Sequence, residues 1–511
     1  MFTPNVHTQD IVELSVSAWF YRNKAIAGFD NPARSLYVAV RELVENSLDA
    51  CEEARTLPEI TVLLKNEEDR SKVDILSQRP ENFELVVKDN GIGMKREAIP
   101  LLLGKMLTGT KFVQRQSRGT FGLGGSLALL YGQVTTQKPI EIVTGQKGKS
   151  YGFSIKMQLD IENNRPIILE EDRVQKAEDE QGTMITFSLQ GDWLRSKKRI
   201  IDYFHQTSII VPYASLLFET PDKDVVRCDR VIHSMPKRSI ATKPHPRGVD
   251  VEMLKSMIST TRAKTLKSFL TNSFQRVGDK KASEFLEYAE LEFTKAPESL
   301  TMNELVRMMN SMESFEGFLP PSPKSLSPVD KEVLLAGIER LSPELVAFKQ
   351  RPPNVYEGHP FIIETGVAYG GELNAGANIV RFANRIPLLY DERSDVSHRV
   401  VRELNLKNYG FRQEDPLTFI MHICSTKIPF KTVGKEYIAD IDVVHREIEL
   451  GFKECLRDLK KRVRKQTRAQ KDHKRETRLA SYYKFIAETL STATGREVQL
   501  KRLFVEGGEA S

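Results

Sequence analysis

Two glycine-rich motifs that follow an amphipathic segment constrain the fold of this 511-residue chain more than any other feature. The first, Asp89 to Gly93, comes directly after Phe83 to Lys88, whose apolar and polar side chains alternate as in a strand. The second, Gly119 to Gly125, runs into Ser126 to Leu130, an apolar segment that predicts the start of a helix. A glycine loop that enters a helix presents backbone N–H groups to phosphates. The sequence therefore predicts an α+β unit with a phosphate-binding loop.

The segment Arg41 to Ala50 places polar side chains on one face of a predicted helix. The spacing i, i+4, i+7 brings together Glu42, Asn46 and Asp49. The packing stripe of the same helix consists of Leu36, Val40, Leu43 and Ser47. An amide oxygen suits Mg²⁺, which binds through few protein ligands plus nucleotide phosphates. A carboxylate one turn earlier can take a proton from an attacking water, so Glu42 is the expected general base and Asn46 the expected metal ligand.

Asp89 lies at the predicted strand end, where a buried carboxylate can accept a hydrogen bond from an adenine amino group. Thr108 to Lys111 is the expected lid over the phosphates. A single glycine turn is usually an ordinary loop, but the order and spacing of these motifs argue against coincidence. The stretch Gly148 to Ser150 ends like a P-loop, yet Val143 stands where that motif needs a glycine, so no Walker-type NTPase is implied.

These motifs resemble the Bergerat nucleotide fold shared by type II topoisomerases, Hsp90, histidine kinases and MutL. Further segments resemble the B subunits of type IIB DNA topoisomerases, the topoisomerase VI family, from about residue 15 to about residue 465. The matching segments are Phe20 to Tyr37, Pro244 to Asp250, Phe274 to Gly278, Gly366 to Gly371, Arg381 to Tyr390 and Ser425 to Phe430.

The resemblance implies an ATP site with Mg²⁺ in which Glu42 and Lys427 are catalytic. Lys427 resembles the switch lysine that reaches the γ-phosphate, and Lys435 is its rival, although a lysine in a loop is usually only solvated. The implied nucleotide contacts are Asn46, Asp89, Gly91, Gly93, Thr110, Lys111, Gly119, Thr120, Phe121, Gly122, Leu123, Gly124, Gly125, Ser126 and Lys427. The secondary candidates are Lys435, Asp49 and Thr183.

The resemblance also implies the domain organisation of an α+β chain. A Bergerat ATPase domain with an N-terminal strap is expected at 1–228, a helix-two-turn-helix domain at 229–310, an exposed proline-rich linker at 311–328, an α/β transducer domain with a long basic helix at 329–480, and a tail at 481–511 with one short helix at 482–490. Apolar patterns within the transducer predict strands at 361–364, 379–385 and 417–423, and helices at 330–341 and 396–404.

The family's partners follow from the same resemblance. ATP is expected to dimerise two B subunits through their ATPase domains, with the segment up to about Arg22 exchanged between them. A separate A-type subunit with a catalytic tyrosine is expected to cut duplex DNA within an A2B2 heterotetramer. The basic run from Lys460 to Arg478 permits contact with DNA, although a solvated helix face explains such a run about as often. The net charge of +6 is small for this length.

Composition excludes several other classes. Four cysteines without paired metal spacing suggest a reducing compartment, and the absence of a signal peptide or long apolar run argues against secretion and membrane insertion. The expected location is intracellular, in the cytoplasm or nucleoid of an archaeon or the nucleus of a eukaryote.

His245 and His359 have no Cys or His neighbours at the spacing of metal ligands and are expected to be structural. The alternatives are a non-catalytic B-like scaffold that supports double-strand breaks, and a chaperone or mismatch-repair ATPase.

Overall fold

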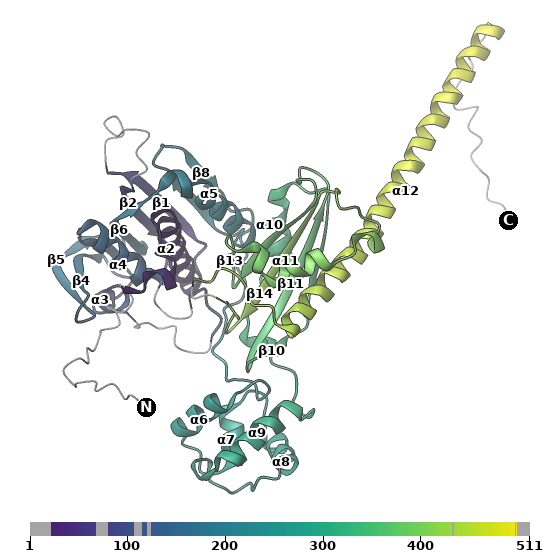
Figure 1. Ribbon diagram of the computed structural model, residues 1–511. Coiled ribbons are helices and arrows are strands. Elements are labelled where there is room, and N and C mark those ends of the chain that lie inside the picture. The colour runs from purple at the N-terminus through teal and green to yellow at the C-terminus, as the bar shows by residue number, and fades with distance from the viewer. Residues whose placement is uncertain are drawn as a thin grey trace, which may run out of the picture.

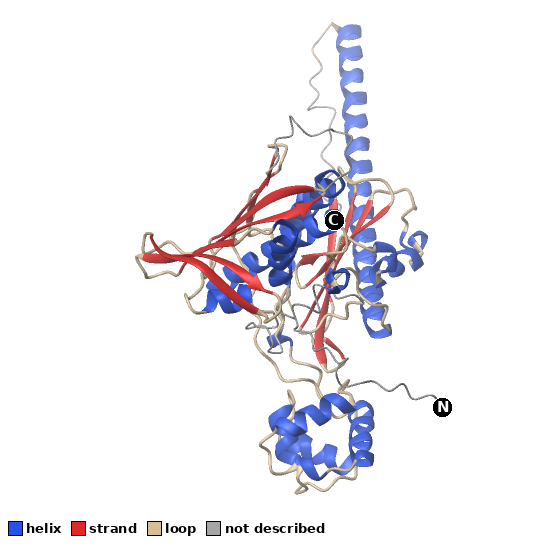
Figure 2. Ribbon diagram, turned by 60° about the vertical axis from the view of Figure 1, so that its left-hand side comes forward, coloured by secondary structure: helices blue, strands red, loops and turns tan. Residues whose placement is uncertain are grey.

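The computed structural model describes residues 22–67, 80–106, 115–119, 124–431, 434–495 and 497. This part of the chain forms the expected α+β fold and consists of three units (Figure 1). We refer to residues 22–228 as the N-terminal unit, to 251–314 as the helical unit and to 331–494 as the C-terminal unit. Figure 2 shows the helical unit as a compact group of helices apart from both sheets.

The N-terminal unit is built on an eight-stranded sheet with the strand order β5-β4-β3-β6-β2-β1-β7-β8. Its strands are β1 (Glu59–Asn66), β2 (Glu81–Asp89), β3 (Ile140–Gly145), β4 (Tyr151–Asp160), β5 (Arg165–Gln175), β6 (Gly182–Gly191), β7 (Ser215–Glu219) and β8 (Val225–Cys228). Neighbouring strands are antiparallel, except that β1 and β7 run parallel. The register pairs Asp89, the last residue of β2, with Thr183 of β6.

Helices cover one face of this sheet and share its core (Figure 2). They are α2 (Pro32–Ala54), α3 (Ala98–Gly104), α4 (Gly124–Thr136) and α5 (Trp193–Ile210). The helix α2 begins where the side chain of Asn31 accepts a hydrogen bond from the Arg34 amide, and Pro32 fits the first turn because its missing N–H is not needed there. The predicted packing stripe of α2 is buried, which turns the opposite face toward a cavity.

The C-terminal unit is built on a six-stranded sheet with the order β10-β11-β14-β12-β13, and β9 also pairs with β11. Its strands are β9 (Leu345–Gln350), β10 (Asn354–Tyr356), β11 (His359–Tyr369), β12 (Ala377–Ala383), β13 (Ile386–Pro387) and β14 (Leu417–Ser425). Its helices are α10 (Lys331–Ile338), α11 (Val396–Glu403) and α12 (Asp442–Thr494). The strands and helices predicted for this region are therefore confirmed, although β12 ends at Ala383, two residues before the predicted end, because Asn384 and Arg385 form the turn to β13.

This second sheet is covered on both faces, so its central strands are buried throughout. Phe419, Met421 and Ile423 of β14 share a core with α12, whereas Ile420 belongs to the core of the N-terminal unit. The helix α10 approaches α5 so closely that a Cβ on Gly337 would lie 1.7 Å from the carbonyl oxygen of Ile209. The core of the N-terminal unit therefore continues into the C-terminal unit, which also has a second core under α12.

The helical unit has its own core, formed by side chains such as Phe269, Phe285 and Met308. It consists of α6 (Val251–Thr260), α7 (Leu266–Ser273), α8 (Asp279–Tyr288) and α9 (Met302–Ser314). A helix corresponding to α9 was not predicted, although Thr301 and Glu304 form a capping box at its start.

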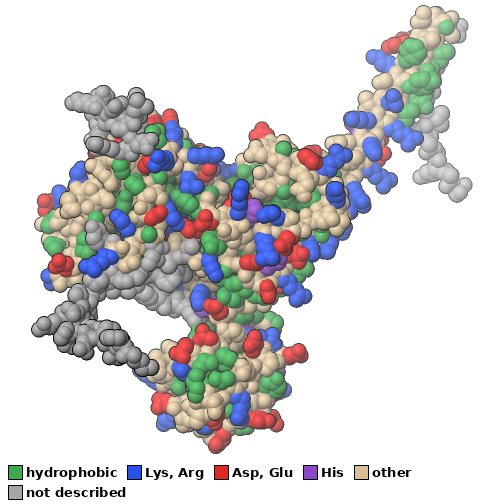
Figure 3. Space-filling view, in the orientation of Figure 1, with side chains coloured by type: hydrophobic (Ala, Val, Ile, Leu, Met, Phe, Trp, Pro, Cys, Tyr) green, Lys and Arg blue, Asp and Glu red, His purple; other side chains and the backbone are tan. Residues whose placement is uncertain are grey.

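Two sequence expectations are wrong. The segment 482–490 is not a separate short helix, because α12 runs without interruption for 53 residues to Thr494. Figure 3 shows Lys and Arg side chains along this helix and apolar side chains near its end. The proline-rich stretch is not fully exposed either, because Ser325, Leu326 and Ser327 are buried where it passes the N-terminal and C-terminal units. Within the described ranges no helix is long and apolar enough to cross a membrane.

Candidate functional site

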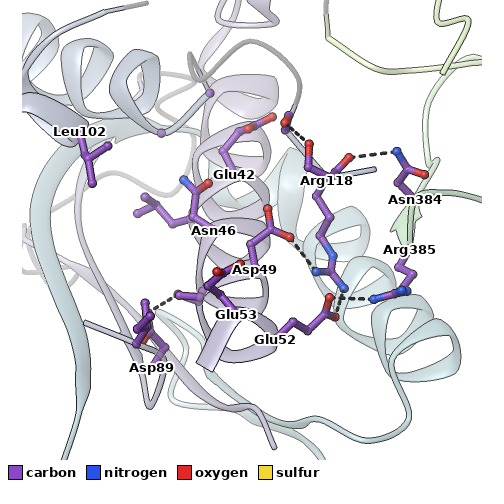
Figure 4. Close-up of a pocket in the computed structure, with 18 of the residues that line it drawn as sticks. Glu42, Asn46, Asp49, Glu52, Glu53, Asp89, Leu102, Arg118, Asn384 and Arg385 are labelled. Atoms are coloured by element: carbon purple, nitrogen blue, oxygen red, sulfur yellow. Dashed lines mark hydrogen bonds and ion pairs between the residues drawn. The ribbon is translucent and has the colours of Figure 1, made fainter. Parts of the chain in front are cut away.

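A cavity of about 920 Å³ opens beside α2 in the N-terminal unit. Glu42, Asn46 and Asp49 all line it, as their shared helix face predicts, and Figure 4 shows their side chains along the same side of α2. Gly93, Gly119, Gly124, Gly125, Ser126 and Thr183 also line it. The three sequence motifs therefore meet in one site.

The second glycine motif lies directly against the polar face of α2. A Cβ on Gly124 would lie 1.7 Å from Oε2 of Glu42, and a Cβ on Gly125 would lie 2.7 Å from Nδ2 of Asn46. Both positions are the first residues of α4. Glycine at both positions lets the backbone at the N-terminus of α4 approach the two polar side chains, which a Cβ would force to move. Thr110, Lys111, Thr120, Phe121, Gly122 and Leu123 lie outside the described residues.

Asp89 is buried at the end of β2 and accepts three hydrogen bonds. Its Oδ1 accepts from the amides of Gly91 (2.9 Å) and Thr183 (3.2 Å), and its Oδ2 accepts from the hydroxyl of Ser47 (2.8 Å). Burial raises the pKa of this carboxyl group, and the three donors oppose that rise. The donors fix the carboxylate and leave room on Oδ2 for one further donor, because a carboxylate oxygen can accept two.

Lys435 reaches this cavity from the C-terminal unit. Its ammonium lies 3.5 Å from Oε1 of Glu42 and 3.3 Å from Oε2 of Glu45, and the side chain is 8% exposed. Burial disfavours its charge, but the carboxylates of Glu42 and Glu45 outweigh burial and raise the pKa of Lys435. Arg41 completes the cluster, 2.7 Å from Oε1 of Glu42.

The loop that carries Lys435 is docked on α2 by its neighbours. Arg41 donates a hydrogen bond to the carbonyl oxygen of Gly434 (3.2 Å), and Arg34 forms an ion pair with Glu436. Lys435 itself has a φ of 55°, a left-handed conformation that is uncommon for a lysine. Such a conformation persists only where the surroundings enforce it, and these contacts do so.

Lys427 occupies a different place. Its side chain is 55% exposed, its ammonium lies 2.9 Å from Oε2 of Glu357, and it is not among the residues that line the cavity. The sequence offered both Lys427 and Lys435 as candidates for the switch lysine. Of these two, the structure places Lys435 beside Glu42.

A group of buried charges at the other end of the cavity was not predicted. Arg118, next to the second glycine motif, donates to Asp49 (2.8 Å) and Glu52 (2.6 Å) on α2. Arg385 of the C-terminal unit donates to the second oxygen of Glu52 (2.7 Å), as Figure 4 shows. Glu52 continues the polar face of α2 and Arg118 adjoins a recognised motif, so both could have been suspected. Arg385 lies within the matching segment Arg381 to Tyr390, but nothing in that segment connects it to the cavity.

The two histidines are hydrogen-bonded. A ring nitrogen of His245 lies 3.0 Å from the carbonyl oxygen of Leu319, and Nδ1 of His359 lies 2.9 Å from the hydroxyl of Thr426. Among the residues that the structure describes, no group of His, Cys, Asp or Glu side chains is arranged to hold a metal ion.

Comparison with known proteins gives matches to both large units. Residues 31–191 match the family of histidine kinase-, DNA gyrase B- and HSP90-like ATPases, and residues 321–475 match the family of the topoisomerase VI B subunit transducer. Proteins named as the B subunit of type 2 DNA topoisomerase 6 are similar over 94% of this chain and 89% of their own length. Identity is 40% for the protein from Metallosphaera sedula, 38% for that from Sulfurisphaera tokodaii and 39% for that from Saccharolobus islandicus.

Proposed function

Because the chain belongs to the family of topoisomerase VI B subunits, we propose that it binds and hydrolyses ATP to drive the passage of DNA through a double-strand break made by an A subunit. ATP-driven dimerisation would open and close the gate for DNA relaxation or decatenation. The observation that carries this proposal is the ion pair between Lys435 and Glu42. It joins the region that matches the transducer family to the cavity of the region that matches the ATPase family.

Within the cavity, we assign hydrolysis to Glu42. Its Oε2 faces Gly124 at the N-terminus of α4, where backbone N–H groups and the helix dipole favour phosphates. A carboxylate in that position can take a proton from a water that attacks the γ-phosphate. Arg41 and Lys435 both contact Oε1 of the same carboxylate, which favours its charged form. Asp49 is too firmly engaged with Arg118 to compete for the role.

The remaining contacts fit ATP and Mg²⁺. Asp89 has room for one more donor, which suits the adenine amino group, and Thr183 lies beside it. Asn46 lines the same cavity beside Gly125, and its amide oxygen is the kind of hard ligand that would hold Mg²⁺. When bound, Mg²⁺ would neutralise charge that develops on the phosphates.

We reassign the role of switch lysine from Lys427 to Lys435. A lysine that senses the γ-phosphate must stand where that group is bound, and Lys435 already pairs with the proposed general base. Its charge and its docked loop would let the C-terminal unit respond to the nucleotide.

Partners follow from membership of the family. A B subunit acts with an A-type subunit and with duplex DNA, and we propose an A2B2 heterotetramer in the compartment that holds the DNA. The long basic stretch of α12 suits a protein that works beside DNA phosphates.

The proposal is tested by measuring ATP turnover of the full chain with and without a purified A-type partner, and relaxation of supercoiled DNA by the mixture. Turnover that depends on Glu42, together with ATP-dependent relaxation, supports it. A chain that stimulates DNA breakage by the A subunit without ATP turnover would instead be a scaffold.

A further inference from the structure

The two residues between β12 and β13, Asn384 and Arg385, form a turn that faces the N-terminal unit. Ala383 and Ile386 are paired, so the turn has two residues, and both have positive φ angles of 48° and 66°. Such a two-residue turn favours Asn first and Gly second. An arginine at the second position is strained, and strain of this kind persists where surrounding contacts hold the residue in place.

The turn reaches three consecutive residues that lead into the second glycine motif, Ser117 directly and Gln116 and Arg118 through Ser327 and Glu52. Gln116 exchanges two hydrogen bonds with the backbone of Ser327, at 2.7 and 3.0 Å. The carbonyl oxygen of Ser117 accepts from Nδ2 of Asn384 at 3.0 Å. Arg118 is bound to Asp49 and Glu52 of α2.

Arg385 links Ser327, the partner of Gln116, to Glu52, the partner of Arg118. Its guanidinium donates to Oε2 of Glu52 (2.7 Å), to the carbonyl oxygen of Ser327 (2.8 Å) and to the hydroxyl of Ser327. Burial alone would raise the pKa of Glu52, but Arg118 and Arg385 hold it at about 2. The carboxylate of Glu52 therefore stays charged between two arginines, one from each unit.

The turn is also anchored within its own sheet. The amide of Arg385 donates to Nε2 of His422 at 3.1 Å, so the proton of this ring lies on Nδ1, which donates to Glu364 at 2.8 Å. Burial lowers the pKa of His422, in agreement with a neutral ring. Glu364 accepts in addition from the amides of Val329 and Asp330 at the end of the connection.

We propose that Asn384 and Arg385 are positioning residues of the ATP site, which hold Gln116 to Arg118 against α2 and so make the affinity for ATP depend on the C-terminal unit. This inference rests on the proposed ATPase function. The contact differs from that of Lys435, because it acts on Glu52 and on the segment that leads into the glycine motif, not on Glu42.

The test is steady-state hydrolysis of ATP by the full chain carrying Arg385→Met, with kcat and KM determined separately. The change removes the donors to Glu52 and Ser327 but leaves Glu42 and Lys435 in place. We expect KM to rise roughly 5- to 150-fold, the usual range for coupling between sites, with kcat unchanged. Arg385→Lys keeps a charge but cannot bond to Glu52 and Ser327 together, so its KM should be intermediate.

Two further variants keep the test independent of folding defects. Asn384→Gly preserves a turn with positive φ while it removes the bond to Ser117, and it should also raise KM. Arg351→Met is the matched control, because Arg351 is a half-buried arginine of the same unit that pairs with Glu447 and Glu454 of α12. Thermal unfolding of all variants reports any general loss of stability.

The coupling itself is measured by a double-mutant cycle. Arg385→Met and Glu52→Gln should be far from additive in their effects on KM, whereas Arg385→Met and Lys435→Met should be nearly additive. The inference is overturned if Arg385→Met has the wild-type KM, if Arg351→Met raises KM equally, or if the first pair is additive. Loss of turnover in Glu42→Ala is scored separately, because a fully active Glu42→Ala protein would refute the proposed function itself.

Discussion

The ammonium of Lys435 lies 3.5 Å from a carboxylate oxygen of Glu42, although the two residues belong to different units and are far apart in the chain. Glu45 and Arg41 complete a buried group of two cations and two carboxylates. Burial raises the pKa of Glu45, and the charge of Lys435 opposes that rise. The charge of each side chain in the group therefore depends on the others. An unpaired buried charge is costly, and the contact therefore couples the position of the C-terminal unit to the proposed general base.

Replacement of Glu42 by alanine should reduce ATP hydrolysis roughly 10²- to 10⁴-fold and leave nucleotide binding nearly intact, because a general base acts mainly in the transition state. Turnover and calorimetric binding of a non-hydrolysable ATP analogue measure the two effects. Glu53→Ala is the control: Glu53 lies on the same helix about 16 Å further along and also lines the cavity. Unchanged turnover in Glu42→Ala would show that Glu42 is not the general base.

Lys435→Met should lower ATP hydrolysis and weaken the closure of the two units on the nucleotide, since it keeps the aliphatic stem but loses the charge. Lys427→Met should leave both unchanged, because Lys427 lies on the surface beside Glu357. Small-angle scattering with a non-hydrolysable ATP analogue follows the closure. If Lys427→Met abolishes compaction and Lys435→Met does not, the reassignment of the switch lysine is wrong.

Asp89→Ala should weaken ATP binding roughly 5- to 150-fold, because an unpaired buried donor costs about 1–3 kcal/mol. Asp89→Asn is the sharper variant: its amide oxygen can still accept from Gly91 and Thr183, while its amino group faces the position meant for a second donor. Calorimetry should show weaker ATP binding for both, and an unchanged thermal midpoint for Asp89→Asn. ATP affinity equal to wild type in Asp89→Asn would place adenine elsewhere.

Gly124→Ala should reduce turnover roughly 10²-fold, the effect expected when a catalytic group is displaced by about 1 Å. The added carbon would lie 1.7 Å from Oε2 of Glu42, so the carboxylate must move. Gly278→Ala in the helical unit is the matched control, because nothing lies within 4 Å of a Cβ there. Wild-type kcat in Gly124→Ala would show that Glu42 acts from another position.

His359 should make the fold less stable in acid. Burial and the nearby Lys427 lower its pKa to about 4, below the value of about 6.5 in an unfolded chain. The unfolded chain therefore binds the proton first, and the stability contributed by neutral His359 is lost as pH falls from about 6.5 toward about 4.

Thermal unfolding at pH 7.5 and pH 5.0 measures this loss. His359→Gln should lose less stability than wild type between the two conditions, whereas His473→Gln, on the exposed part of α12, should match wild type. An equal loss in His359→Gln and wild type would contradict the assignment.

The helix face of Glu42, Asn46 and Asp49 could be predicted from sequence because helical spacing alone brings these side chains together. Asp89 could be placed at a strand end for a similar reason, since the alternation of β2 is local. Such local patterns also predict the main strands and helices of the C-terminal unit. The continuity of α12 could have been predicted as well, because no proline or glycine interrupts the chain between Gly451 and Gly495.

The choice between Lys427 and Lys435 could not be made in this way. It depends on contacts of Arg34 and Arg41 with a loop about four hundred residues later in the chain, and no periodicity of the sequence predicts such contacts. The burial of Ser327 was missed for the same reason. A proline-rich stretch predicts a connection, but only its packing against Gln116 and Arg385 decides whether that connection is exposed.

The length of α12 has a mechanical consequence. Its contacts with the body of the C-terminal unit continue to Val463 and Gln466, and from Gln466 to Thr494 the helix extends for about 42 Å at 1.5 Å per residue. Rotation of the C-terminal unit by about 10° would therefore move the far end of a rigid helix through about 7 Å. Small movements around Lys435 would thus become displacements of several ångströms at the far end of α12, and a rigid helix would act as a lever arm between the nucleotide site and the contacts of its tip.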